Sequence, residues 1–155
     1  MGDDHSDTQT MRTWFGLTAR VTIGQGFIHK AGIGRLAIPH PPVANWLLRQ
    51  GLPADVKRGL SFAHEFAHFQ TGPVVLLYMI LLSAACYMKG RIGPAVVLQI
   101  LVSAQAVWEM LSESVVVLTT RAPYRKSYQG IIKLPRFLSW LSGAVLTAAG
   151  WLVVI

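Results

Sequence analysis

The sequence contains little charge and a single cysteine. Only 14% of its 155 residues are Asp, Glu, Lys or Arg, against about 25% in an average globular chain, which disfavours a disordered chain, a solvated coiled coil and a histone-like basic protein. Cys86 has no second cysteine for an intramolecular disulfide, and a cysteine-based metal or redox cluster is excluded. Because Cys86 lies inside an apolar run, we expect a small buried side chain.

Acidic residues are also scarce, with 7 Asp and Glu against 14 Lys and Arg and a net charge of +7. Basic residues beside apolar spans face anionic lipid head groups more often than nucleic acid. Hydrophobic residues make up 52% of the chain, and the mean hydropathy is +0.44. We therefore expect a mostly α-helical membrane protein that contacts membrane lipids and does not bind nucleic acid.

Three apolar stretches predict a membrane domain at 73–155, with transmembrane helices at about 73–88, 94–120 and 137–155. Seven Lys and Arg residues precede the first stretch, two lie between the first and second, and five lie between the second and third. The positive-inside rule then places the N-terminal region and the 121–136 loop in the cytoplasm. We expect an integral protein of the cell membrane, taken as the bacterial inner membrane.

The N-terminal part predicts a flexible polar tail at 1–12 and a cytoplasmic subdomain at 13–72. Two strand-like runs, 17–23 and 34–39, predict a small sheet or hairpin. A short amphipathic helix is expected at 43–51, and a second helix from Leu52 to a break at Gly72 and Pro73. The five tryptophans are expected to anchor the chain at the interface or to face lipid, namely Trp14, Trp46, Trp108, Trp140 and Trp151.

The second helix carries the motif H-E-x-x-H, formed by His64, Glu65 and His68. Residues four apart project from one helical face, so both imidazoles can reach one tetrahedral metal ion while the Glu lies beside the metal-bound water. Random placement of 5 His and 3 Glu in this chain yields the motif about 0.003 times. The alternative is a pair of histidines held by ordinary hydrogen bonds in the core or at the interface.

An H-E-x-x-H zinc site needs a third protein ligand. Outside the N-terminal tail, the start of the helix and the motif itself, only Glu109 and Glu113 remain as carboxylate donors. Both interrupt an apolar helix, where an ionised carboxylate is costly unless it is paired or bound to metal. Helix height favours Glu113, although a kink at Pro73 would shift the register, and either residue remains a candidate.

The segment VKRGLSFAHEFAH, followed later by WEMLSES, resembles the gluzincin metallopeptidases of the membrane CAAX-prenyl-endopeptidase and heat-shock-protease group. Their pattern is H-E-x-x-H and then E-x-x-x-D. The resemblance implies that His64 and His68 bind zinc, that Glu109 is the third ligand, and that Glu113 stands where the family has a supporting Asp. It also implies that Glu65 is the general base. Site-2 proteases are a second resemblance, but their Asp-containing second motif is missing.

The function expected from these patterns is a zinc-dependent membrane hydrolase, specifically a metalloprotease that cleaves membrane-associated polypeptides. Two other classes stay open. A non-catalytic accessory subunit would keep a structural metal site, and a diiron oxidase or hydroxylase would use His and Glu to bind iron. Assembly into a homo-oligomer or a larger membrane complex is compatible with each class.

Overall fold

The computed structural model describes residues 7–23, 29–33, 36–40, 52–120, 133–152 and 154–155. Four short strands are followed by three helices, α2 (Ala54–Met88), α3 (Pro94–Thr119) and α5 (Lys133–Trp151). The expected class, mostly helical with a small N-terminal β-containing part, is confirmed. The helix expected at 43–51, with Trp46, lies outside the described residues.

The strands form one antiparallel sheet in chain order, β1 (Asp7–Arg12), β2 (Thr18–Ile23), β3 (His29–Ile33) and β4 (Leu36–His40). The strands β2 and β4 match the two strand-like runs of the sequence. The assignment of residues 7–12 to a flexible tail was wrong, because these residues pair with β2 along their whole length. β-branched side chains favour that pairing, and the hydroxyl oxygens of Thr8 and Thr22 lie 3.0 Å apart across the two strands.

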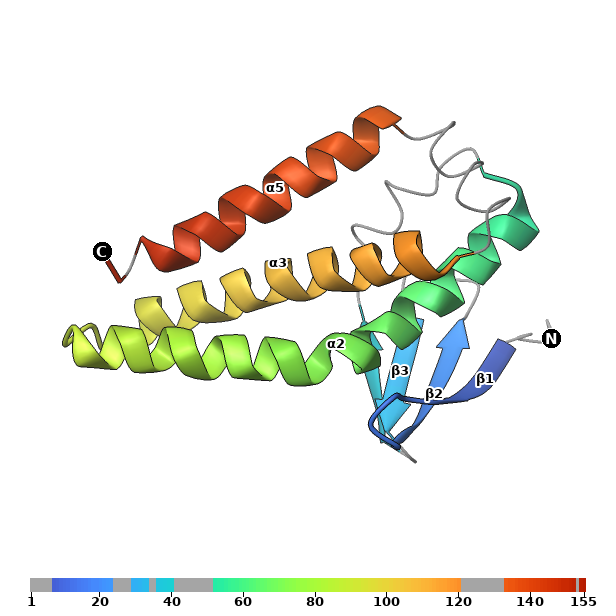
Figure 1. The fold of residues 1–155 in the computed structure, drawn as a ribbon, viewed down its shortest axis with the longest axis horizontal. Coiled ribbons are helices and arrows are strands. Elements are labelled where there is room, and N and C mark those ends of the chain that lie inside the picture. Colours follow the sequence, from blue (N-terminus) through green and yellow to red (C-terminus); the bar gives the residue numbers. More distant parts are fainter. Residues whose placement is uncertain (1–6, 24–28, 34–35, 41–51, 121–132, 153) are drawn as a thin grey trace, which may run out of the picture.

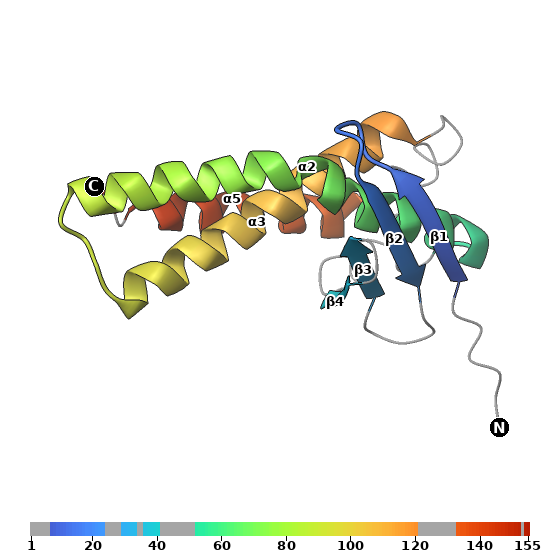
Figure 2. The ribbon, with the colours of Figure 1, turned by 90° about the horizontal axis from the view of Figure 1, so that it is seen from below.

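One face of β2 packs against α2. Ala19 and Val21 are buried, whereas the alternating Thr18 and Arg20 are exposed, as expected for a strand with one face on a core. The sheet lies beside the N-terminal half of α2 (Figures 1 and 2). At the opposite end of the molecule lie the α2–α3 turn and the C-terminus.

Helix α2 does not break at Gly72 and Pro73, as the sequence predicted, but continues to Met88 with Pro73 inside it. Proline has no N–H to donate to the carbonyl of Phe69, and its ring crowds that carbonyl. Long helices accommodate a proline by bending, and Figure 1 shows that the axis of α2 changes direction part way along. Packing along α3 on both sides of Pro73 stabilises the continuous helix.

Within the described residues, α2 and α3 are the two helices long and apolar enough to cross a membrane. Only 22% and 28% of their most apolar windows are buried, whereas the core helix of a soluble protein is mostly buried. The third expected span falls in α5, which begins at Lys133 rather than at residue 137, and its status as a span is not confirmed. Large apolar side chains are exposed on all three helices, among them Val74, Leu77, Leu81, Leu98, Leu101, Leu141 and Val145.

Helices α3 and α5 approach each other at two glycines. A Cβ atom added to Gly150 would lie 2.2 Å from Oγ of Ser103, and one added to Gly143 would lie 2.6 Å from Sδ of Met110. The Ser103 hydroxyl donates to the carbonyl of Thr147 and lies 2.6 Å from the hydroxyl of Tyr78. This serine therefore connects α3 with both neighbouring helices. Cys86 is buried and is a free cysteine, as expected.

Candidate metal centre

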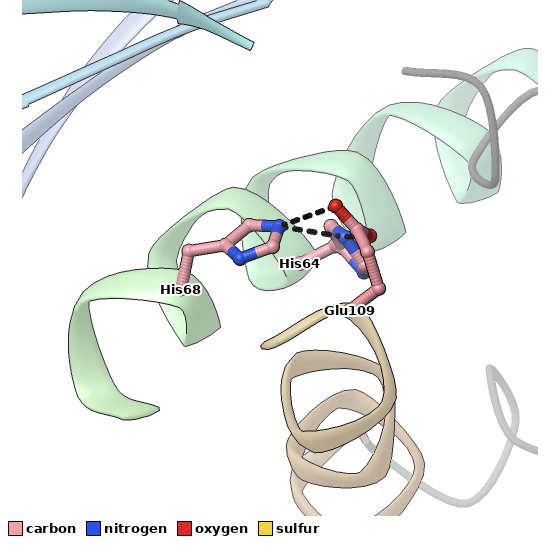
Figure 3. Close-up of side chains that lie close together, drawn as sticks. All are labelled: His64, His68 and Glu109. Atoms are coloured by element: carbon pink, nitrogen blue, oxygen red, sulfur yellow. Dashed lines mark hydrogen bonds and ion pairs between the residues drawn. The ribbon is translucent and has the colours of Figure 1, made fainter. Parts of the chain in front are cut away.

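Three side chains from two helices converge in the half of the molecule that carries the sheet. His64 and His68 project from α2 toward α3, and the carboxylate of Glu109 reaches them from α3 (Figure 3). The two Nε2 atoms are 3.0 Å apart. Oε2 of Glu109 lies 3.1 Å from Nε2 of His64, and Oε1 lies 3.5 Å from Nε2 of His68.

The outer nitrogen of each imidazole contacts α3. Nδ1 of His64 lies 2.8 Å from Oε2 of Glu113, and Nδ1 of His68 lies 3.0 Å from Oγ of Ser112. An ionised carboxylate only accepts hydrogen bonds, so Nδ1 of His64 donates to Glu113. Nε2 of His64 then faces the Glu109 carboxylate, and either a proton on Nε2 or a metal ion between the two groups stabilises their approach.

The triangle of donor atoms fits a small tetrahedral metal ion. Zinc bonds of about 2.0–2.2 Å to nitrogen and oxygen place neighbouring ligand atoms about 3.3–3.5 Å apart. The two Nε2 atoms are 3.0 Å apart, and the histidines approach different oxygens of Glu109, at 3.1 Å from His64 to Oε2 and 3.5 Å from His68 to Oε1. These separations are close to that range, and one donor atom from each residue lies within 4.8 Å of the others. The imidazole of His64 is only 1% exposed, and the side chain of Glu109 is 23% exposed. The donor set therefore combines two buried imidazoles with one carboxylate that remains partly accessible.

The carboxylate of Glu109 contacts Nε2 of His64 and belongs to the donor group, whereas the carboxylate of Glu113 contacts Nδ1 on the opposite side of the same ring. Helix height had favoured Glu113 because it assumed a symmetric hairpin. In the structure the turn after Met88 runs part of the way back toward the sheet before α3 begins (Figure 2). Glu109 therefore comes level with the histidines earlier along α3 than a symmetric hairpin implies.

Glu65 is almost completely buried, at 1% exposure. It lies about 100° around the helix from His64. Gln70, on the sheet side of α2, accepts from the backbone N–H of Trp14 through its side chain. Gln70 lies about 140° around the helix from Glu65, so Glu65 is buried on a side of α2 away from the Trp14 contact.

Several residues that support the site were not found by sequence analysis. The indole N–H of Trp108 donates to the carbonyl of His68 at 2.8 Å, and its ring packs edge-on against the His68 imidazole. Trp108 is therefore part of the site, a role that its expected position at the interface or toward lipid did not include. The side-chain amide of Gln105 donates to Oε1 of Glu109. The usable signal was spacing, because Gln105, Trp108, Glu109, Ser112 and Glu113 repeat at three and four residues.

Comparisons with protein-family models, with curated proteins and with solved structures found no match for this chain.

Proposed function

We propose that the protein is an integral membrane zinc hydrolase, and specifically a metalloprotease that acts on membrane-associated polypeptides. The observation that carries the proposal is the triangle formed by Nε2 of His64, Nε2 of His68 and a carboxylate oxygen of Glu109. Structural zinc sites use four protein ligands, whereas catalytic sites use three and keep one position open. Three donor residues from the described part of the chain therefore favour a catalytic centre over a structural one.

Each residue of the centre has a distinct task. His64, His68 and Glu109 hold the metal, and zinc, when bound, activates water for attack and polarises a carbonyl group. The carboxylate of Glu65 accepts the proton that this water releases and passes it to the leaving amine. Glu113 and Ser112 orient the two imidazoles from behind, in the way that outer-shell partners commonly hold metal-binding histidines. Trp108 fixes the backbone of the turn that carries His68.

The level of the centre suits a substrate at the membrane surface. His68 precedes Met88 by a length of helix that rises about 30 Å, which matches the thickness of a hydrocarbon core. With Met88 at one interface, the centre lies at the other, on the side of the sheet. The Lys and Arg distribution favours the cytoplasm for that side. The third span, along α5, and the bacterial inner membrane remain parts of the proposal.

Peptide hydrolysis is preferred over other hydrolytic reactions on two grounds. The H-E-x-x-H motif and the later Glu resemble the membrane gluzincins, and a four-stranded antiparallel sheet adjoins the helix that carries the centre. Antiparallel sheets can bind an extended polypeptide by adding it as a strand at an open edge. The edge strands of this sheet are β1 and β4.

The decisive experiment compares wild type with Glu65→Gln and His68→Ala, each purified in detergent after expression in cells that lack the endogenous protein. We expect about one zinc per chain in wild type and in Glu65→Gln, and little zinc in His68→Ala. Cells that carry Glu65→Gln should also accumulate an uncleaved membrane protein that cells with the wild-type protein cleave. Full complementation by Glu65→Gln but not by His68→Ala would instead establish a structural metal site, and bound iron would establish the oxidase alternative.

A further inference from the structure

The turn between β1 and β2 exposes a cluster of apolar side chains. We call residues Thr13–Leu17 the hairpin tip. Trp14 is 70% exposed and Leu17 is 45% exposed, and the Trp14 ring packs edge-on against Phe15 at 5.0 Å. The backbone N–H of Thr13 donates to the carbonyl of Leu17, and the Thr13 hydroxyl bonds to Leu17 as well. The tip is thus an ordered turn with its apolar side chains directed outward.

The hairpin tip is attached to α2 by two hydrogen bonds from Trp14. Its backbone N–H donates to Oε1 of Gln70 at 3.1 Å, and its indole N–H donates to the Gln70 carbonyl at 2.9 Å. The first bond fixes the backbone of the turn to Gln70, and the second holds the edge of the indole against α2. Figures 1 and 2 show that the tip is the end of the β1–β2 hairpin nearer the half of α2 that runs toward the α2–α3 turn.

This attachment places the tip at the boundary of the exposed apolar surface. The exposed apolar residues of α2 begin at Val74, which is about 6 Å along the helix from Gln70. Toward the sheet, α2 carries the exposed charged residues Asp55, Lys57 and Arg58 instead. An indole at such a boundary, with one apolar side and one hydrogen-bonding edge, suits the interfacial region of a bilayer.

The charge around the tip has one sign. Residues 8–23 contain Arg12 and Arg20 and no acidic residue. Both arginines are exposed. Arg12 pairs with Thr18 and Arg20 pairs with Thr10, so the two arginines lie on the same face of the hairpin, the face opposite the buried Ala19 and Val21. The guanidinium of Arg12 lies over the tip, 3.9 Å from where a Cβ atom on Gly16 would be. Arginine binds phosphate groups through several donors at once.

We propose that the hairpin tip docks on the anionic lipid surface, with Trp14 and Leu17 in the interfacial layer and Arg12 and Arg20 on lipid phosphates. The inference rests on the membrane placement described above and not on the hydrolytic activity. It extends the lipid contact of the protein from its helices to the sheet. It also gives the sheet a fixed height beside the metal centre, because Gln70 is two residues from His68.

The test measures the depth of single spin labels in the full chain reconstituted into lipid nanodiscs. Cysteines replace Leu17 at the tip, Thr8 at the far end of the hairpin, or Leu81 in the exposed apolar part of α2, all in a Cys86→Ala background. In discs that contain anionic lipid, the label at position 17 should be about threefold less accessible to a water-soluble nickel chelate than the label at position 8. Combining Leu17→Cys with Arg12→Gln and Arg20→Gln should remove most of that protection.

Equal accessibility at positions 17 and 8 would overturn the proposal, and so would full protection at position 17 in the double arginine variant. A water-exposed label at position 81 would overturn the membrane placement and the proposal with it. Zinc content, measured on the unlabelled Cys86→Ala protein in the same nanodiscs, reports separately on the proposed metal centre. Failure of the lipid contact and failure of the hydrolase proposal are therefore distinguishable.

Discussion

Nδ1 of His64 lies 2.8 Å from Oε2 of Glu113, so the carboxylate that looked interchangeable with Glu109 in the sequence contacts the opposite side of the imidazole. The two glutamates thus contact different ring nitrogens of the same histidine. Glu109 shares the donor triangle with His64, and Glu113 determines which nitrogen carries the proton.

This division predicts different losses from two equivalent substitutions. Glu109→Gln replaces a charged ligand, whereas Glu113→Gln leaves all three ligands and weakens only the support of His64. We expect Glu113→Gln to lower zinc affinity by about 10-fold to 100-fold, and Glu109→Gln to lower it further. Competition with a chelator of known affinity measures both values, and a larger loss in Glu113→Gln would reverse the assignment.

Ser112 is predicted to support His68 in the same way. Its hydroxyl lies 3.0 Å from Nδ1 of His68, so Ser112→Ala should weaken zinc binding about 10-fold, at the lower end of the range for such partners. Ser114→Ala is the matched control, because among the described residues the Ser114 hydroxyl donates within its own helix, to the carbonyl of Met110 at 2.7 Å. Equal zinc affinity in the two variants would contradict the role of Ser112.

The contact between α3 and α5 predicts a rescue experiment. Gly150→Ala would force a Cβ atom to 2.2 Å from Oγ of Ser103, and overpacking of this kind costs about 1–3 kcal/mol. Adding Ser103→Gly removes the clashing atoms, so the double variant should be more stable than the sum of the single effects predicts. Thermal unfolding in detergent measures the difference.

Gly59→Ala serves as the control for the helix-propensity part of that change. A Cβ atom on Gly59 meets nothing within 4 Å, so this variant should gain about 0.5–1 kcal/mol. A similar gain in Gly150→Ala would show that α5 does not pack on α3 as described.

Membrane orientation is tested by labelling from each side of sealed vesicles. In a Cys86→Ala background, Arg91→Cys in the α2–α3 turn should react only from the side opposite the cytoplasm. The segment between the first two apolar stretches contains only two of the 14 Lys and Arg residues, and the positive-inside rule places such a segment outside the cytoplasm. Asp55→Cys, exposed near the start of α2, should react only from the cytoplasmic side. Reaction of both positions from one side would exclude a single crossing by α2.

Local patterns in the sequence predicted the parts of the site that depend on one helix. The spacing of His64 and His68 puts both rings on one face whatever the rest of the chain does. The choice between Glu109 and Glu113 depends on the path of the turn that joins two helices. No local pattern specifies that path, so the register could not be predicted.

The same limit explains the errors in the fold. The segment at 7–12 is polar, and its strand forms because β2 offers a partner. Pro73 is a helix breaker in isolation, yet α2 continues through it where α3 supplies packing on both sides. Trp108 looked suited to lipid, but its indole N–H faces a carbonyl of the neighbouring helix. In each case a tertiary contact outweighed a local preference.

The donor residues of the centre, together with Glu113, all lie on two consecutive helices joined by a short turn, with 49 positions separating His64 from Glu113. Helical hairpins are local structures that form early. α2 and α3 therefore contain all of the donor residues without α5. If the centre binds zinc as proposed, a released chain that ends before α5 is expected to bind it already.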